Sequence, residues 1–309
     1  PGVAAVPENV SGMAATQEAL YGELDLALSW SERELPERER TKHVHRLHPY
    51  LGKFVPQLVE ALLERYVRPG GRVLDPFAGS GTTLVQALES GYDAVGVDIA
   101  AFNALLVSVK TREHDLEALD ADVRELASDL GESTERPTGY VREWFAPQAA
   151  AELLWFRDAI RGRATEDVLR VVLARAARSA RRTTHFDLDF PRTPQVGEYW
   201  CHKHRRTCRP VGTAGKFITR YLADTAARVR AFAAVRDPRR AAMILHGDAR
   251  DLELGGPYDG VITSPPYPGL IDYHEQHRYA YELLGLEDLR MDEIGAAARG
   301  TARPALADY

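Results

Sequence analysis

Hydrophobic positions recur along the chain with two different periods, and the alternation between them predicts the fold class. From 56 to 67 the apolar residues have helical spacing, so we expect an amphipathic helix that begins near Pro56. The continuous apolar run RVLDPF at 72–77 is typical of a strand buried on both faces. A glycine turn and a helix beginning near Thr82 follow, and then the second apolar run DAVGVD at 93–98. Strand, helix and strand in this order predict a parallel sheet.

Two later apolar runs, AMILHG at 242–247 and DGVITS at 259–264, are expected to be two more strands of that sheet. The long interval before them is mainly helical, except for an irregular and aromatic stretch at 182–210. The chain therefore leaves an α/β core and later re-enters it. We expect three parts, an acidic N-terminal extension, a core in two pieces and a large helical insertion, at 1–40, at 41–110 with 241–309, and at 111–240.

Charge is unevenly distributed along the 309 residues, although the net charge of −6 by itself indicates no partner. Residues 151–240 contain 20 Lys or Arg and 9 Asp or Glu, whereas the remaining residues contain 19 and 36. This basic segment predicts a partner with a negative surface, and the alternative is an arginine-rich helical face in contact with solvent. No apolar run reaches the roughly 18 residues of a membrane helix. Two cysteines are too few for a disulfide framework, so we expect a cytoplasmic protein in a reducing environment.

The turn after the first predicted strand has the sequence DPFAGSGTT, which begins at Asp75. Open α/β sheets bind ligands at the carboxyl ends of their strands, where this turn lies. Gly79 and Gly81 let the backbone approach a ligand closely, and a helix from Thr82 directs its free N–H groups at a negative group. The lysine of a Walker loop and the third glycine of a dinucleotide fingerprint are both missing.

Two further carboxylates follow predicted strands of the same sheet. Asp98 ends the second strand, where it can accept hydrogen bonds from both hydroxyls of a ribose. Asp248 follows the third strand, within reach of the amino group of an adenine. A ligand with a carboxylate, a ribose and an adenine but no phosphate suits all three strand ends. These groups therefore predict S-adenosylmethionine as cofactor, and the alternative is that they serve turn formation alone.

Three motifs together resemble those of the amino-methylating DNA methyltransferases, which modify N4 of cytosine or N6 of adenine. They are HPYLGKF at 48–54, DPFAGSGTT at 75–83 and TSPPY at 263–267. The resemblance implies a Rossmann-like methyltransferase sheet, with target recognition in the interval between the motifs. It also implies a set of cofactor-binding residues: Phe54, Asp75, Gly79, Gly81, Thr82, Asp98 and Asp248. The residues implied to hold the target base are Ser264, Pro265, Pro266 and Tyr267.

The chemistry of this family gives the Ser-Pro-Pro-Tyr corner a function. A base inside a duplex must be flipped out before its amino group can react. The rigid corner then presents a backbone carbonyl and the Ser264 hydroxyl to that amine, while Tyr267 stacks on the base, which is worth roughly 1–3 kcal/mol. We predict a site-specific DNA methyltransferase that uses direct in-line transfer without a covalent nucleophile.

The base that is modified is predicted from the resemblance alone. Ser264 before the two prolines is similar to the members that methylate N4 of cytosine, so we favour cytosine. The alternatives, in order, are N6 of adenine, N2 of guanine in RNA, and a DNA-binding module without catalytic activity.

The interval between the motifs contains the expected surface for double-stranded DNA. The stretch EYWCHKHRRTCRP at 198–210 interleaves aromatic and basic residues, which suit base stacking and contacts to phosphates or guanine edges. Just before it, arginines at 175–182 recur with mostly helical spacing. The expected DNA contacts are Arg181, Arg182, Tyr199, Trp200, Lys203, Arg205, Arg206 and Arg209.

The same stretch contains both cysteines of the chain. Cys201, His204 and Cys208 could form a zinc site. The fourth ligand would then be His202 or His185. Because the spacing matches no standard zinc finger, we predict two ordinary semi-buried cysteines and no metal.

The resemblance also implies an expectation about the extent of the chain. A methyltransferase sheet of this family has seven strands, whereas four can be placed in this sequence. We therefore expect a fragment whose C-terminal strands are missing, with an unpaired sheet edge at the strand that ends in Ser264. Such a chain would be poorly active alone and would self-associate or need a complementing segment. A cognate restriction enzyme is a further expected partner, and no membrane association is expected.

Overall fold

The computed structural model describes residues 28, 30–31, 33–188, 191–266 and 271–294. Tyr267 therefore lies outside the described residues. The chain divides into two compact units, residues 1–39 and 40–309. Two short helices come first along the described chain, α2 (Glu37–Arg40) and η2 (His43–Arg46).

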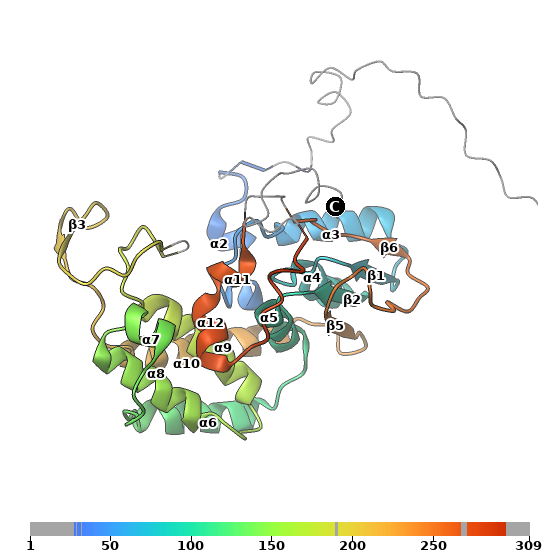
Figure 1. The fold of residues 1–309 in the computed structure, drawn as a ribbon. Coiled ribbons are helices and arrows are strands. Elements are labelled where there is room, and N and C mark those ends of the chain that lie inside the picture. The colour runs from blue at the N-terminus through green and yellow to red at the C-terminus, as the bar shows by residue number, and fades with distance from the viewer. Residues whose placement is uncertain (1–27, 29, 32, 189–190, 267–270, 295–309) are drawn as a thin grey trace, which may run out of the picture. The chain divides into compact units, whose positions relative to one another are not determined.

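Four parallel strands form the sheet of the second unit, in the order β5-β2-β1-β6 (Figure 1). They are β1 (Arg72–Asp75), β2 (Asp93–Asp98), β5 (Ala242–His246) and β6 (Gly260–Val261). All four predicted strands are thus confirmed as members of one parallel sheet. Because the strands are parallel and adjacent, the segments that follow them meet at one edge of the sheet, where such sheets bind ligands.

Three helices cover the sheet: α3 (Pro56–Tyr66), α4 (Thr82–Ser90) and α5 (Ala101–Thr111). Both predicted helix starts are confirmed, at Pro56 and at Thr82. Proline suits the first helical position because its missing N–H would have no partner there. Gly81 and Gly91 flank α4 with φ of 77° and 84°, which are left-handed conformations that favour glycine. The apolar sides of α3 and α4 form a common core with β1 and β2.

The interval between β2 and β5 is mainly helical, as predicted. After α5 it contains α6 (Leu116–Ser128), α7 (Gly139–Trp144), α8 (Pro147–Ala159), α9 (Glu166–Ala180) and α10 (Gly215–Ala233). Two further helices follow β6, α11 (Tyr273–Gln276) and α12 (Arg278–Leu284). One hydrophobic core joins these parts, since it includes Leu153 and Leu173 from the interval, Phe102 of α5 and Tyr279 of α12. The helices of the interval are therefore packed onto the α/β core (Figure 1).

The irregular stretch expected at 182–210 contains a two-stranded antiparallel hairpin, β3 (Tyr199–Cys201) and β4 (Arg206–Cys208). In its register Trp200 pairs with Thr207, while Tyr199 pairs with Cys208. Because side chains alternate along a strand, Trp200 lies on the face opposite to Tyr199 and Cys201. The hairpin projects from the helices at the left of Figure 1.

Among the described residues, β6 is one of the two edge strands of the sheet, and β1 is its neighbouring strand. Val261 on this strand is 59% exposed. As for membrane association, no helix in the part of the chain that the structure describes is both long and apolar enough to cross a bilayer.

Candidate functional site

The loop between β1 and α4 depends on two glycines in left-handed conformations. Gly79 has φ of 51° and Gly81 has φ of 77°. A Cβ atom at Gly79 would lie 2.9 Å from the hydroxyl oxygen of Tyr50. A Cβ atom at Gly81 would lie 2.8 Å from a methyl group of Val107. Both the backbone conformation and the available space therefore require glycine at these positions.

Lys110 of α5 holds the same loop. Its side chain is buried, and its Nζ donates a hydrogen bond of 2.5 Å to the backbone carbonyl of Ser80. Burial lowers the pKa of Lys110 well below its usual value, and the charge of Lys53 lowers it further. This contact joins the loop to α5.

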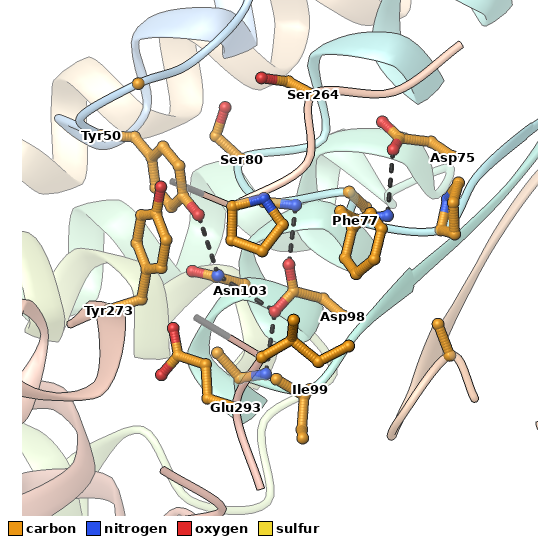
Figure 2. Close-up of a pocket in the computed structure, with 18 of the residues that line it drawn as sticks. Tyr50, Asp75, Phe77, Ser80, Asp98, Ile99, Asn103, Ser264, Tyr273 and Glu293 are labelled. Carbon is orange, nitrogen blue, oxygen red and sulfur yellow. Dashed lines mark hydrogen bonds between the residues drawn. The ribbon is translucent and has the colours of Figure 1, made fainter. Parts of the chain in front are cut away.

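Asp98, at the end of β2, is the centre of the hydrogen-bond network of the loop (Figure 2). Its Oδ2 accepts from the backbone N–H of Gly79 at 2.7 Å. Its Oδ1 accepts from the backbone N–H of Ala100 at 2.8 Å and from the side-chain amide of Asn103 at 3.1 Å. Burial nevertheless raises the pKa of Asp98 to about 7. A carboxyl group that changes charge near neutral pH inside a pocket is typical of a functional site.

Asp75, at the end of β1, joins the loop to the Ser-Pro-Pro corner. Its Oδ1 accepts a hydrogen bond of 2.7 Å from the hydroxyl of Thr263 and one of 3.2 Å from the backbone N–H of Phe77. The carboxyl is buried, which raises its pKa, whereas the hydrogen bonds lower it. The residue before Ser264 is therefore fixed directly beside the glycine loop.

Two tyrosine rings form one wall of the site. Tyr50 and Tyr273 are stacked, with ring centroids 5.0 Å apart and planes 9° apart (Figure 2). The Tyr50 hydroxyl accepts a hydrogen bond of 3.2 Å from Asn103, which also donates to Asp98. Burial raises the pKa of Tyr50 well above its usual value, and the nearby Asp98 raises it further, so the hydroxyl stays protonated.

These groups surround one pocket that is open to solvent. Most of the predicted cofactor and base residues line it: Phe54, Asp75, Gly79, Thr82, Asp98, Asp248, Ser264 and Pro266. Gly81 and the exposed Pro265 lie nearby in sequence but do not line the pocket.

The pocket is acidic. Among its described lining residues five have carboxyl groups, Asp75, Asp98, Asp248, Asp292 and Glu293, and Lys53 is basic. Asp248 forms an ion pair of 2.5 Å with Arg250, which lowers its pKa. This charge distribution suits a positively charged ligand and disfavours a phosphate.

The pocket residues that sequence reasoning missed include Tyr50, Asn103, Tyr273 and Glu293. Tyr50 lies in the HPYLGKF motif, from which the prediction took Phe54 alone. Glu293 Oε2 lies 2.8 Å from Nδ1 of the buried His274, so it is part of a hydrogen-bonded pair. Tyr273 and Glu293 follow the Ser-Pro-Pro corner in the chain, and no local pattern indicates that they fold back onto it.

Most of the predicted DNA contacts lie on the hairpin. Trp200 is 58% exposed, and the basic side chains on and after the hairpin turn are also exposed: Lys203, Arg205, Arg206 and Arg209. Arg209 forms an exposed ion pair of 2.6 Å with Glu198. Tyr199 and Arg182 are partly buried.

Arg181 does not belong to this surface, contrary to the prediction. It is 2% exposed, its guanidinium lies 4.5 Å from the centroid of the Tyr279 ring, and it donates a hydrogen bond of 2.5 Å to the carbonyl of Leu188. Arg175 is likewise buried and pairs with Asp224 at 2.5 Å. The arginine pattern near the end of α9 is therefore partly internal, because these side chains join α9 to α10 and α12.

Comparisons with known proteins agree with this geometry. The family model described as DNA methylase matches residues 19–105. The chain is 32% identical to the Type II methyltransferase M.MjaII of Methanocaldococcus jannaschii, over 95% of this chain and 72% of that protein. It is 33% identical to the Type II methyltransferase M.MvaI of Kocuria varians, over 29% of this chain and 20% of that protein. It is 32% identical to M.BsoBI of Geobacillus stearothermophilus, over 28% of this chain and 18% of that protein.

Proposed function

The chain belongs to the family of amino-methylating DNA methyltransferases, and from this premise we propose that it methylates N4 of cytosine in double-stranded DNA with S-adenosylmethionine as methyl donor. The observation that carries the proposal is the acidic pocket in which Asp98, the glycine loop and Ser264 meet. The match to the DNA methylase family model supports DNA as the substrate.

The residues of the pocket fit this cofactor. Asp98 would accept hydrogen bonds from ribose hydroxyls, and Asp248 from an adenine amino group, since both residues line the pocket. The buried Oδ1 of Asn103 has no partner among the described residues and is available to a donor on the ligand. When bound, the cofactor supplies an electrophilic methyl group on a positively charged sulfur. The excess of carboxyl groups among the described lining residues of the pocket suits this positive charge.

The Ser-Pro-Pro corner would orient the target amine. The hydrogen bond from Thr263 to Asp75 holds the residue before Ser264 beside the glycine loop. The Ser264 hydroxyl and a backbone carbonyl of the corner would accept the hydrogens of the amine and direct the nitrogen lone pair toward the methyl group. Tyr267 would stack on the flipped base. Proximity and orientation would then be the main sources of rate, and no residue needs to form a covalent bond to the base.

The helical interval at 111–240 would recognise the target. Its hairpin offers the exposed Trp200 and a group of basic side chains to a negatively charged partner. Arginine and lysine contacts to phosphates provide affinity, and arginines at guanine edges provide sequence preference. Arg181 is not included in this surface, because it is buried.

Nucleoside mass spectrometry tests the proposed reaction. The chain is incubated with isotopically labelled S-adenosylmethionine and either mixed duplex DNA or RNA, and each nucleic acid is digested to nucleosides. Labelled N4-methylcytosine is expected, at a rate that falls strongly for Ser264→Ala. Labelled N6-methyladenine would instead identify adenine as the target base. Label in RNA alone, or cofactor binding by calorimetry without any label transfer, would contradict the proposal.

Two partners form part of the proposal. Type II methyltransferases are named among the relatives, which supports a cognate restriction enzyme with the same target sequence. The edge at β6 and the exposed Val261 support self-association. Light scattering of the wild type and of Val261→Lys tests the second point, and an unchanged monomeric mass for both would contradict it.

A further inference from the structure

Four side chains with the chemistry of zinc ligands meet at the β3–β4 hairpin. From the sequence we predicted two ordinary cysteines and no metal, with His202 or His185 as the fourth ligand of the alternative zinc site. The structure places His185, from the segment after α9, beside the cysteines. One ligand atom of each residue lies within 4.8 Å of those of the other three: His185, Cys201, His204 and Cys208. His185 Nδ1 lies 3.3 Å from the sulfur of Cys201. His204 Nδ1 lies 3.5 Å from the sulfur of Cys208.

These separations fit a tetrahedral metal site. Zinc binds sulfur at about 2.3 Å and imidazole nitrogen at about 2.0–2.1 Å, which separates neighbouring ligand atoms of a tetrahedron by about 3.3–3.8 Å. Both of the measured nitrogen–sulfur distances lie in this interval. Since the other ligand atoms are within 4.8 Å, small side-chain movements complete the geometry.

We propose that His185, Cys201, His204 and Cys208 bind one structural zinc ion. Two thiolates and two imidazoles select zinc over the hard cations magnesium and calcium, which prefer oxygen ligands. Two thiolate ligands neutralise the charge of the ion. His202 is not part of this cluster, and its ring centroid lies 6.1 Å from that of Phe186.

Hydrogen bonds or a disulfide do not explain why all four side chains converge. A thiol–imidazole hydrogen bond would explain each nitrogen–sulfur pair, but not the convergence of all four groups. A disulfide is absent, since both cysteines are free. Cys201 and Cys208 are also not opposite each other, because Cys201 pairs with Arg206 and Cys208 with Tyr199.

The hairpin has few other interactions within the described chain that could stabilise it. Among the residues of β3 and β4, Cys201 is the one that is buried, and Trp200 is mostly exposed. An isolated two-stranded hairpin without an apolar core is marginally stable in water. In addition, Arg205 in its turn has a left-handed φ of 51°. A metal bound by both strands, the turn and His185 would hold this segment in place.

The role of the site in recognition depends on the proposed function. Cys201 and Cys208 lie on one face of the hairpin, where the metal would bind, and Trp200 lies on the opposite face. We infer that the zinc ion orders the hairpin as a surface for double-stranded DNA and has no part in methyl transfer. Neither cysteine lines the acidic pocket.

Metal analysis of the complete chain, expressed without a histidine tag, tests the site. After dialysis against metal-free buffer, mass spectrometry should detect about one zinc per chain. Replacement by Co²⁺ should produce visible bands of tetrahedral cobalt and a thiolate-to-cobalt band in the near ultraviolet. Because the chain has only two cysteines, a thiolate band identifies Cys201 or Cys208. The other metal-like groups of the described residues, such as His43, His45 and Glu89, have no sulfur.

Matched variants locate the ligands. Cys208→Ser and His185→Ala should each lose at least tenfold in zinc affinity, whereas His202→Ala, in the same hairpin, should retain full zinc content. If a cysteine variant does not fold, the cobalt spectrum of the wild type still decides the question. A wild type without a thiolate band and with both thiols reactive toward a disulfide reagent would overturn the proposal. Zinc retained by the double variant with Cys201→Ser and Cys208→Ser would also overturn the proposal.

DNA and cofactor binding separate this inference from the proposed function. Removal of zinc by a chelator should weaken DNA affinity at least tenfold and leave S-adenosylmethionine affinity unchanged. If the zinc-loaded chain binds no DNA, the proposed function and the recognition role both fail, while metal analysis still decides the zinc site. If zinc removal leaves DNA affinity unchanged, the recognition role alone is wrong.

Discussion

The hydroxyl of Thr263 donates a hydrogen bond of 2.7 Å to Oδ1 of Asp75, across 188 residues of sequence. This contact joins the end of β1, where the glycine loop starts, to the residue before the Ser-Pro-Pro corner. The buried carboxyl group of Asp75 therefore contacts both the glycine loop, where the cofactor would bind, and the segment that leads to Ser264, where the base would bind.

Thr263→Val tests this anchor, because valine keeps the shape of threonine and removes the donor. The buried Asp75 then loses a partner, so we expect a loss of about 1–3 kcal/mol in the free energy of unfolding. Methylation should slow because the corner is no longer fixed. Thr219→Val on α10 is the control, since its exposed hydroxyl bonds only within its own helix, at 3.2 Å. Urea unfolding and turnover are measured, and equal effects of both variants would refute the role of the contact.

Cofactor affinity should depend on pH through Asp98. The pKa of Asp98 is raised to about 7, so the carboxylate is a minor form at pH 6 and the major form at pH 8. A ligand that donates hydrogen bonds to this group and has a positive charge prefers the ionised form. We therefore expect about tenfold tighter binding of S-adenosylmethionine at pH 8 than at pH 6. Calorimetry should detect this difference in the wild type and a flatter profile in Asp98→Asn. If cofactor affinity changed equally with pH in the wild type and in Asp98→Asn, Asp98 would not be the group responsible.

His277 should make the fold sensitive to acid. Burial, together with the charges of Arg178 and Arg181, lowers its pKa to about 3. The unfolded imidazole titrates near 6.5, so below that pH the unfolded state binds a proton that the folded state excludes. This contribution to stability is present at pH 7 and is lost as pH falls from 6.5 toward 3.

His277→Phe removes the titrating group and keeps an aromatic ring among Tyr50, Phe102 and His48. Between pH 7 and pH 5 the variant should lose about 2 kcal/mol less unfolding free energy than the wild type. His202→Phe, at an exposed position, should behave like the wild type. Urea unfolding at both pH values provides the comparison, and identical losses in all three proteins would show that His277 is not responsible.

Neutralising Arg205, Arg206 and Arg209 together should weaken DNA binding and reduce its dependence on salt. Each lost phosphate contact lowers the slope of log affinity against log salt by about one. The matched control replaces three exposed arginines outside the hairpin, Arg124, Arg161 and Arg239, with glutamine. Fluorescence anisotropy over a salt series gives both slopes. An unchanged slope in the hairpin variant would locate the DNA surface elsewhere, and a loss confined to one DNA sequence would indicate base contacts.

Tyr267→Ala should lose most turnover and keep cofactor affinity, since it removes the proposed stacking surface and leaves the glycine loop intact. Removal of one base–aromatic stack costs roughly 1–3 kcal/mol. Asp98→Ala should show the opposite pattern, with weaker cofactor binding. Single-turnover kinetics and calorimetry separate the two effects. Wild-type turnover of Tyr267→Ala would contradict the proposed mechanism.

The local sequence determined the elements of the α/β core. All four strands lie where continuous apolar runs predicted them, and α3 and α4 begin at Pro56 and Thr82 as expected. These features depend on neighbouring residues, on the period of apolar positions and on the conformations of proline and glycine. The convergence of Asp75, Asp98 and Asp248 on one pocket was also predictable, because the carboxyl ends of adjacent parallel strands meet.

The tertiary structure alone decided which side chains are partners across long intervals. The arginine spacing near α9 is the same for an exposed face and for a buried one, and packing against α12 buries Arg181. Tyr273 meets Tyr50 only because the chain after β6 returns to the pocket. His185 joins the two cysteines because the hairpin folds back on the segment after α9. Periodicity reports the environment of one element, whereas such contacts depend on how distant elements pack, and no local pattern encodes that.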